Sequence, residues 1–321
     1  MSLLTADITW LKKIRVPKRY APIIFLTPFV ALFLIFGMFP MLFSLFLAFQ
    51  SWEPTAGLSA MQYVGLSNFT FALSDEWFWK SFKNTVWMTL VSGIPQHVIA
   101  IPLACFIHHS FGRLRNLVVG VYFVPYITST VAIAMMFGTL FSSDYGMINQ
   151  GLHKLASMPL IGSYFPQQNI DWISNPEHLQ PAIAMIIFWR YLGFNIVLYL
   201  AALQTIPAEL YEAATMDGAT RMQKFWHITL PSLRPMIYFG VTLTLIGGLQ
   251  LFEEPFILTN GNGGSDQAGM TSAIYLYRMA FDFNDFGAAS AMSWILFVII
   301  AALTYATNWV FRERRSTREE G

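Results

Sequence analysis

Apolar residues along this chain gather in six long runs separated by more polar stretches. A helix needs about 20 apolar residues to cross the hydrocarbon core of a bilayer. The runs that are long enough lie at 23–49, 85–107, 117–141, 181–204, 236–258 and 287–311. Only the fourth and fifth runs contain an Asp, Glu, Lys or Arg. We therefore predict an all-α polytopic membrane protein with about six transmembrane helices.

Composition supports this prediction. Of the 321 residues, 55% are hydrophobic and 12% are charged, whereas soluble domains have about 25% charged residues. A net charge of +1 gives no indication of a nucleic-acid partner. The first apolar run is longer than the ~7–15-residue apolar region of a cleavable signal peptide, so we expect it to remain as the first membrane span.

The basic residues between the runs predict the orientation. Fourteen of the 19 Lys and Arg residues lie in one set of connections, and four lie in the alternate set. The richer set comprises Lys12, Lys13, Arg15, Lys18, Arg19, Arg113, Arg115, Arg221, Lys224, Arg234, Arg312, Arg314, Arg315 and Arg318. Because cytoplasmic loops carry the excess of Lys and Arg, we expect a cytoplasmic N-terminal tail (1–22), a membrane domain (23–311) and a cytoplasmic C-terminal tail (312–321).

Three residues that are charged at neutral pH fall inside the predicted spans. Arg190 lies in the fourth span, and Glu253 and Glu254 lie near the end of the fifth. An ionisable group at the bilayer centre costs about 2.5–3.5 kcal/mol on insertion scales, so it is normally paired or functional. Both sets lie toward the outer half of the membrane, which makes an ion pair between Arg190 and one glutamate reasonable. Such a pair could be structural, or it could line a cavity and contact a hydroxylated ligand.

The cytoplasmic connection at 206–235 is polar and helix-forming. Pro207 is tolerated at the start of a helix, where its missing N–H would be unpaired anyway. Gly218 can end that helix in a left-handed conformation, and a second helical stretch is expected to stop at Pro231. We predict two short helices that meet at a glycine. Two small residues, Ala213 and Ala214, would let another surface approach the backbone closely.

The same loop carries a specific motif. It reads Glu-Ala-Ala, three residues, Gly, nine residues, Ile, one residue and Leu-Pro, which is matched by Glu212, Ala213, Ala214, Gly218, Ile228, Leu230 and Pro231. This resembles the EAA loop of permease subunits in binding-protein-dependent ABC importers. The stretches that begin at Phe252 and Tyr277 resemble the carbohydrate-uptake branch, of the maltose or lactose type. The resemblance covers about residues 20–312. One departure is the segment 260–265, which reads Asn-Gly-Asn-Gly-Gly-Ser in place of a compact Gly-Gly-Pro.

The resemblance implies that this chain works as one subunit of a larger complex. Residues 23–311 would form a permease domain in the bacterial inner membrane. Its partners would be a second permease subunit, two copies of an ABC ATPase that holds ATP and Mg, and an extracytoplasmic solute-binding protein. The loop would be a coupling helix that docks into the ATPase. The residues implied in coupling are Glu212, Ala213, Ala214, Met216, Asp217, Gly218, Ile228, Leu230 and Pro231. A second interpretation of Glu212 is a carboxylate that stabilises the N-terminal part of its helix.

Sugars are recognised by aromatic rings and by amide or carboxylate groups that bond their hydroxyls. The resemblance implies that these contacts lie on the fourth and fifth spans. Our candidates are Trp189, Arg190, Tyr191, Gly193, Asn195, Tyr199, Gly248, Gln250, Phe252, Glu253 and Glu254. The aromatic residues could instead be packing, and the glycines could serve either close helix approach or room for a ligand ring.

Catalytic chemistry is not indicated. The chain has no Gly-x-x-x-x-Gly-Lys-Ser/Thr motif for a nucleotide, and its histidines show no zinc-like pairing with carboxylates. We therefore expect neither an enzyme nor a metal or cofactor site in this chain. The preferred function is a sugar or oligosaccharide importer permease. Alternatives are a permease for a polyol, glycerol phosphate or polyamine, an ion-coupled secondary transporter and a membrane-embedded enzyme.

Overall fold

The computed structural model describes residues 17, 19–110 and 112–311, and it confirms the all-α membrane fold. Two-residue strands, β1 (Gln50–Ser51) and β2 (Gln62–Tyr63), pair antiparallel in the loop after the first helix. Most of the two tails, including Lys12, Lys13, Arg15, Lys18 and the four C-terminal arginines, lies outside the described residues.

Five helices are long and apolar enough to cross a membrane, and a bent pair brings the possible number of spans to six. The first is α1 (Ala21–Phe33), which continues through a π-helical turn at Leu34–Met38 into α2 (Phe39–Leu47). The others are α4 (Glu76–Ser110), α8 (Pro176–Leu203), α11 (Leu230–Leu249) and α14 (Phe286–Phe311).

The third and fifth runs are not straight helices. The third consists of α5 (Arg115–Ile127) and α6 (Thr130–Leu140), which meet at an angle of 93°. The fifth breaks after Leu249 and resumes as the short helix α12 (Glu253–Leu258). Each break lies inside a segment whose average hydropathy stays apolar, so the hydropathy of the sequence does not reveal it.

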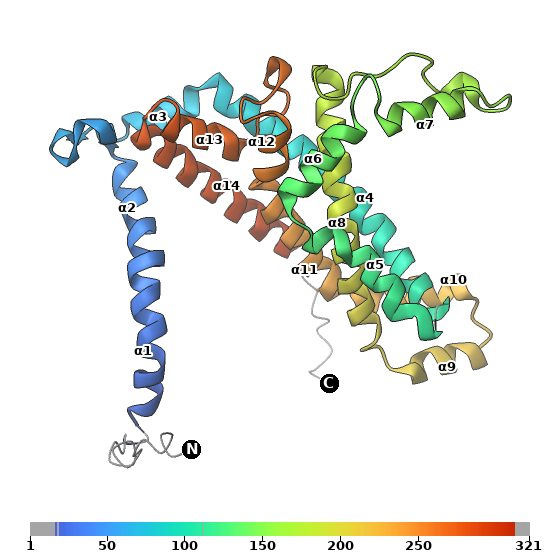
Figure 1. Ribbon diagram of the computed structural model, residues 1–321. Helices are drawn as coiled ribbons and strands as arrows, with labels where there is room; N and C mark the ends of the chain where they lie inside the picture. The colour runs from blue at the N-terminus through green and yellow to red at the C-terminus, as the bar shows by residue number, and fades with distance from the viewer. Residues whose placement is uncertain (1–16, 18, 111, 312–321) are drawn as a thin grey trace, which may run out of the picture.

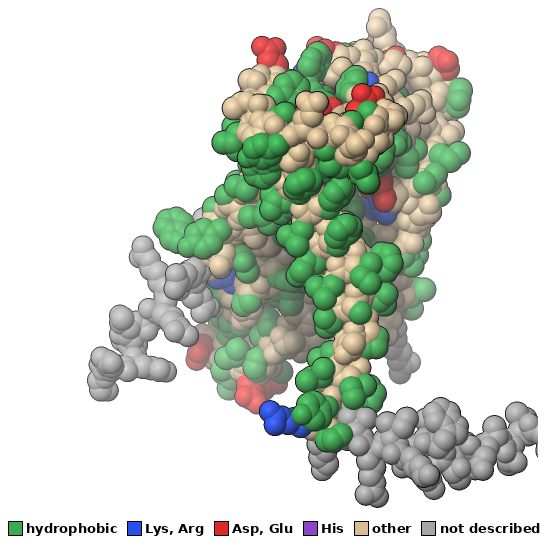
Figure 2. Space-filling view, turned by 90° about the vertical axis from the view of Figure 1, so that its left-hand side faces the viewer, with side chains coloured by type: hydrophobic (Ala, Val, Ile, Leu, Met, Phe, Trp, Pro, Cys, Tyr) green, Lys and Arg blue, Asp and Glu red, His purple; other side chains and the backbone are tan. Residues whose placement is uncertain are grey.

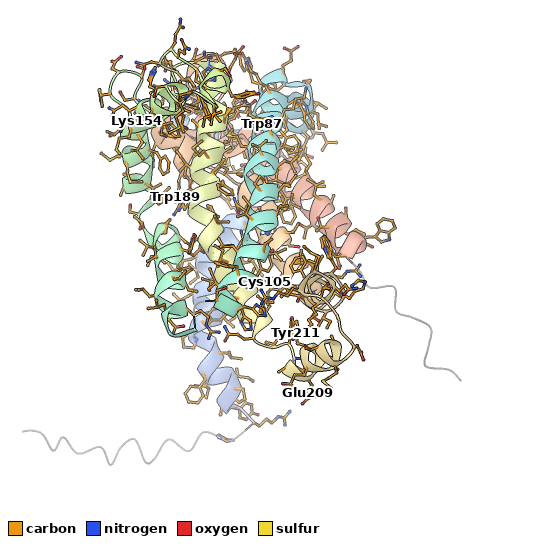
Figure 3. The ribbon with its side chains drawn as sticks, turned by 90° about the vertical axis from the view of Figure 1, so that its right-hand side faces the viewer. Trp87, Cys105, Lys154, Trp189, Glu209 and Tyr211 are labelled. Carbon is orange, nitrogen blue, oxygen red and sulfur yellow. The ribbon has the colours of Figure 1, made fainter. Side chains whose placement is uncertain are left out.

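The shorter helices gather at the two ends of the molecule (Figure 1). The helices α3 (Ser67–Ser74), α7 (Met147–Ala156) and α13 (Ser272–Phe281) lie at one end. The helices α9 (Ala208–Met216) and α10 (Arg221–Lys224) lie at the other, where α1 also begins. Lys154 of α7 and Glu209 of α9 mark these opposite ends in Figure 3. Single 3-10 turns occupy Pro54–Ala56, Leu58–Ala60, Gly112–Leu114, Gly162–Tyr164 and Ser265–Gln267.

The centre of the bundle is formed by α4, α8 and α11. Their contact is built from small and branched side chains, among them Ala100, Ala104, Ile196 and Leu233, each of which is fully buried. Small residues let helix backbones approach closely, and close packing is what holds helices together in a bilayer. The first span differs, because no side chain of α1 is buried. It stands apart from the bundle (Figure 1), and Figure 2 shows apolar side chains along its length.

Candidate functional site

A cavity of about 230 Å³ lies in the membrane-spanning part of the bundle, among α4, α5, α8 and α11. It is lined by Thr89, Ser92, Gln96, Tyr126, Ile187, Tyr191, Phe194, Asn195, Leu243, Thr244, Gly247, Gly248 and Leu251. In the described part of the chain, every lining residue is uncharged at neutral pH. The cavity therefore combines amides, hydroxyls and aromatic rings without a fixed charge.

Two buried amides form the polar wall of this cavity. Asn195 on α8 donates a hydrogen bond from Nδ2 to Oε1 of Gln96 on α4, over 3.1 Å. Gln96 in turn donates weakly to the carbonyl of Ile187, over 3.5 Å. Oδ1 of Asn195 is buried and has no hydrogen-bond partner among the described residues. Asn195 lines the cavity, and a buried polar atom without a partner is costly, so a hydroxyl group that reached this oxygen would satisfy it.

Aromatic rings form a second wall. Tyr126 on α5 stacks on Phe194 with ring centroids 4.8 Å apart, and it meets Tyr191 edge-on at 5.8 Å. Aromatic faces are apolar surfaces against which the C–H face of a sugar ring can pack, and a tyrosine also carries a polar group. The arrangement suits a ligand that has both apolar faces and hydroxyl groups.

Three of the eleven predicted path residues line the cavity: Tyr191, Asn195 and Gly248. A Cβ on Gly248 would overlap the side chain of Thr89, whereas a Cβ on Gly247 would meet nothing within 4 Å. Gly248 therefore serves close helix packing as well as lining the cavity, and Gly247 leaves open space.

The other predicted path residues lie elsewhere. Trp189 packs edge-on against Phe137 and is partly exposed (Figure 3). A Cβ on Gly193 would overlap the carbonyl oxygen of Tyr122, so this glycine allows α5 and α8 to approach. Gln250 lines a separate cavity between α11 and α14. Phe252 stacks on Phe256, with ring centroids 4.8 Å apart.

Arg190 forms the ion pair that its position suggested. Its Nη1 lies 2.5 Å from Oε1 of Glu254, and the two side chains are 12% and 3% exposed. The guanidinium also lies over the ring of Tyr191, 5.5 Å from its centroid. Glu253 is exposed and stands outside this pair. The pair joins α8 to α12, and neither residue lines the cavity. The structure thus favours the structural interpretation of these charges.

The polar residues that α4 contributes to the cavity were not among the predicted path residues. Thr89, Ser92 and Gln96 are spaced by three and four residues, which places them on one face of a helix. A polar stripe on an otherwise apolar span marks a surface that faces the protein interior or a cavity. That spacing is the signal that could have identified them. Tyr126, Phe194 and Thr244 were also missed, and no comparable pattern marks them.

The loop between α8 and α11 has the predicted elbow. Its first helix, α9, ends at Met216, and Gly218 adopts φ +76°, in the left-handed region that favours glycine. The amides of Gly218 and Ala219 then bond the carbonyls of Thr215 and Ala214. The second helix, α10, begins with a capping box between Thr220 and Gln223.

Two side-chain contacts brace this elbow. The hydroxyl of Tyr211 lies 2.9 Å from that of Thr229, and Nζ of Lys224 donates to Oγ1 of Thr215 over 2.6 Å. Met216 projects at the end of α9 and is 88% exposed. The predicted coupling residues run from Glu212 on α9, through the exposed turn at Asp217 and Gly218, to Pro231 at the start of α11; Glu209 and Tyr211 mark α9 in Figure 3. Of these residues, Glu212, Ala213, Met216, Asp217, Gly218 and Pro231 are exposed, while Ala214, Ile228 and Leu230 are half-buried.

The expected stop at Pro231 is wrong. After α10 the chain passes through a π-helical turn at Phe225–Thr229 and continues directly into α11, where Pro231 occupies the first turn. A proline normally disrupts a helix because it lacks an N–H and its ring meets the carbonyl four residues earlier. The wider π turn shifts the hydrogen-bond pattern by one residue, so the helix accommodates the proline and runs on into the membrane.

Comparison with known proteins agrees with this architecture. The sequence profile of the family described as "Binding-protein-dependent transport system inner membrane component" matches residues 98–315. The chain belongs to this family, and it is accordingly a membrane permease rather than an enzyme. The resemblance inferred from the Glu212–Pro231 motif is confirmed.

Individual relatives are similar over nearly the whole chain. The arabinooligosaccharides transport system permease protein AraP of Bacillus subtilis is 34% identical, over 89% of this chain and 87% of its own length. The lactose transport system permease protein LacF of Rhizobium radiobacter is 32% identical, over 93% and 97%. Among solved structures, a chain of a bacterial ABC transporter involved in the import of the acidic polysaccharide alginate superimposes with a TM-score of 0.75. It is 26% identical and covers 97% of this chain and 100% of its own.

Proposed function

We propose that this chain is one half of the membrane core of an ATP-driven importer for an uncharged sugar or oligosaccharide. The observation that carries the substrate class is the cavity, whose lining combines two buried amides, several hydroxyls and stacked aromatic rings without a charged side chain among the described residues. The names of the relatives, which refer to arabinooligosaccharides and lactose, support the same class. At about 230 Å³ the cavity is smaller than the ~300–1,000 Å³ of typical ligand pockets, so a longer saccharide would also contact the second permease subunit.

The alternatives from the sequence fit this cavity less well. A phosphate ligand favours Arg or Lys, and a polyamine favours carboxylates. Arg190 and Glu254 are close in sequence to the lining residues Tyr191 and Leu251, but they pair with each other outside the cavity. A permease for either ion would therefore need its charges from another subunit.

Transport would be driven by a separate ATPase through the loop Glu212–Pro231. Its elbow at Gly218 and the projecting Met216 give a stiff exposed turn, which suits docking to a partner. Two ATPase copies would bind ATP and Mg, a second permease would complete the path, and an extracytoplasmic binding protein would deliver the solute. This loop and both termini would be cytoplasmic, as the distribution of Lys and Arg indicates.

The test is reconstitution of the complete complex in proteoliposomes. The purified permease pair, ATPase and binding protein are combined, and uptake of radiolabelled lactose and arabinotriose is measured with and without ATP. ATP-dependent uptake of one saccharide, with no competition from glycerol 3-phosphate or putrescine, is the expected result. Uptake driven by an ion gradient in liposomes that lack the ATPase would refute the coupling, and competition by either charged solute would refute the substrate class.

A further inference from the structure

A hydrogen-bonded cluster joins three helices next to the cavity. On α4, Nδ1 of His97 lies 2.7 Å from the hydroxyl of Tyr199 on α8. The other ring nitrogen, Nε2, lies 3.1 Å from Oγ1 of Thr244 on α11. Tyr199 is fully buried, and Thr244 also lines the cavity. The cluster lies one helical turn from Asn195 toward the end of α8 that leads to α9. One imidazole thus connects the α8 wall to the α11 wall.

The packing leaves little freedom in this cluster. A Cβ on Gly240 would lie 2.9 Å from the hydroxyl of Tyr199 and 3.4 Å from Cε1 of His97, so only glycine lets α11 approach at this level. A Cβ on Gly93 would lie 2.7 Å from the methyl group of Thr244. The methyl group of Thr244 is therefore directed at α4 and its oxygen at His97. The remaining freedom of Thr244 is the direction of its hydroxyl hydrogen.

The two hydrogen-bond partners of His97 indicate its tautomer. A neutral imidazole has one donor nitrogen and one acceptor nitrogen. If Nδ1 carried the hydrogen, the buried phenol of Tyr199 would be an acceptor here and its own hydrogen would have no partner among the described residues. If Nε2 carries the hydrogen, Tyr199 donates to Nδ1 and Nε2 donates to Thr244, so both polar groups are satisfied. Buried polar groups are overwhelmingly satisfied, which favours the hydrogen on Nε2.

This tautomer has a consequence for the cavity. When Oγ1 of Thr244 accepts from His97, its own hydrogen is free to be donated to a ligand. The hydroxyls of Thr89 and Ser92 are already used, because each donates to a backbone carbonyl four residues earlier, over 2.7 Å. Asn195 contributes an acceptor, its unpartnered Oδ1. Among the lining residues of α11, Thr244 is the one with a polar side chain.

We infer that His97 is a positioning residue: it holds the Thr244 hydroxyl so that it donates into the cavity, to an oxygen of the bound saccharide. The inference rests on the proposed function, because it assigns a role within the same cavity. The donor from α11 and the acceptor Asn195 on α8 would then bind one solute from two helices. An ether or hydroxyl oxygen of a sugar accepts such a hydrogen bond, whereas an ammonium group cannot.

The first test reads the tautomer directly. The intact complex is prepared with ¹⁵N-histidine, and solid-state NMR assigns His97 as the signal that disappears in His97→Phe. A protonated Nε2 with an unprotonated Nδ1 is expected, and it should become a mixture of tautomers in Tyr199→Phe. Protonation at Nδ1 in the wild-type complex overturns the inference. This measurement tests the tautomer even if no saccharide is transported.

The second test measures uptake in the reconstituted complex, with lactose and arabinotriose as probes. Thr244→Val keeps the methyl packing and removes the hydroxyl, and Thr244→Ser is the matched control that keeps it. We expect Thr244→Val and His97→Phe each to raise the half-saturating concentration about tenfold, which corresponds to the loss of one neutral hydrogen bond to the saccharide. The maximal rate should stay near that of the wild type.

The double variant His97→Phe/Thr244→Val distinguishes a positioning role of His97 from a general effect on the stability of the protein. Because His97 acts through Thr244, the double variant should be no worse than either single variant. Additive losses, or a lower maximal rate with an unchanged half-saturating concentration, would contradict the inference while leaving the proposed function intact. If His97→Phe fails to assemble, Tyr199→Phe takes its place in the cycle with the same expected non-additivity. Failure of the wild-type complex to import either probe would instead refute the proposed function.

Discussion

Replacement of Arg190 by methionine is expected to destabilise the protein strongly. Methionine keeps much of the side-chain length and removes the guanidinium that pairs with Glu254. The carboxylate, which is 3% exposed, would then remain buried without its partner. In the described structure its hydrogen bond from Arg190 is the one contact that compensates this charge.

The magnitude follows from the burial of the pair. Breaking a buried ion pair by removing one partner costs about 3–5 kcal/mol, because an uncompensated charge is left in a low-dielectric environment. Replacing both partners by apolar residues of similar volume is often neutral or stabilising. We therefore expect a loss of about 3–5 kcal/mol for Arg190→Met, and recovery of most of it in the double variant with Glu254→Met.

The assay is the free energy of unfolding from a titration with SDS in mixed micelles, followed by circular dichroism of the helices. The single variants, the double variant and the wild type are measured at the same pH and salt concentration. Wild-type stability of Arg190→Met would refute the reasoning, since it would mean that the carboxylate needs no counter-charge. A double variant as unstable as the single one would place the loss in packing rather than in electrostatics.

Three further predictions use the same reagents. Gly218→Val, at φ +76°, forces a β-branched residue into the left-handed region at a cost of at least about 1–2 kcal/mol; we expect ATP hydrolysis that no longer drives uptake, with normal membrane yield, and normal uptake would contradict the docking role. Gly193→Ala places a Cβ against the carbonyl oxygen of Tyr122, and overpacking of this kind costs about 1–3 kcal/mol, to be measured by the SDS titration. Lys80→Met breaks an ion pair with Asp266 whose side chains are 38% and 71% exposed; exposed pairs contribute about 0–1 kcal/mol, so a larger loss in the same titration would contradict this estimate.

Local signals in the sequence were enough for the membrane architecture. Transfer of a side chain from water to lipid depends mainly on that side chain, so runs of apolar residues identify the helices that cross. The elbow at Gly218 was also readable, because a left-handed helix end requires a glycine and its position was marked by flanking helical patterns. The pairing of Arg190 was also predictable, because a charged residue inside the membrane is normally paired and the sequence has few acidic residues at that depth.

Other features depended on the path of the backbone. Hydropathy measures affinity for lipid and contains no information on the direction of a helix axis, so the 93° bend between α5 and α6 was not predictable from it. The helix that continues through Pro231 depends on the π turn that precedes it. Neither feature changes the composition of its segment.

The sequence by itself therefore determined the class of protein, the approximate number of apolar segments and the motif in the loop, because each follows from residues that are neighbours along the chain. Only the tertiary structure decided which face of each helix meets which neighbour. His97 bonds residues that are 102 and 147 positions away, and the cavity exists where small residues on α11 let it approach α4 and α8. Such contacts depend on shape complementarity between distant side chains, and a single sequence does not reveal them.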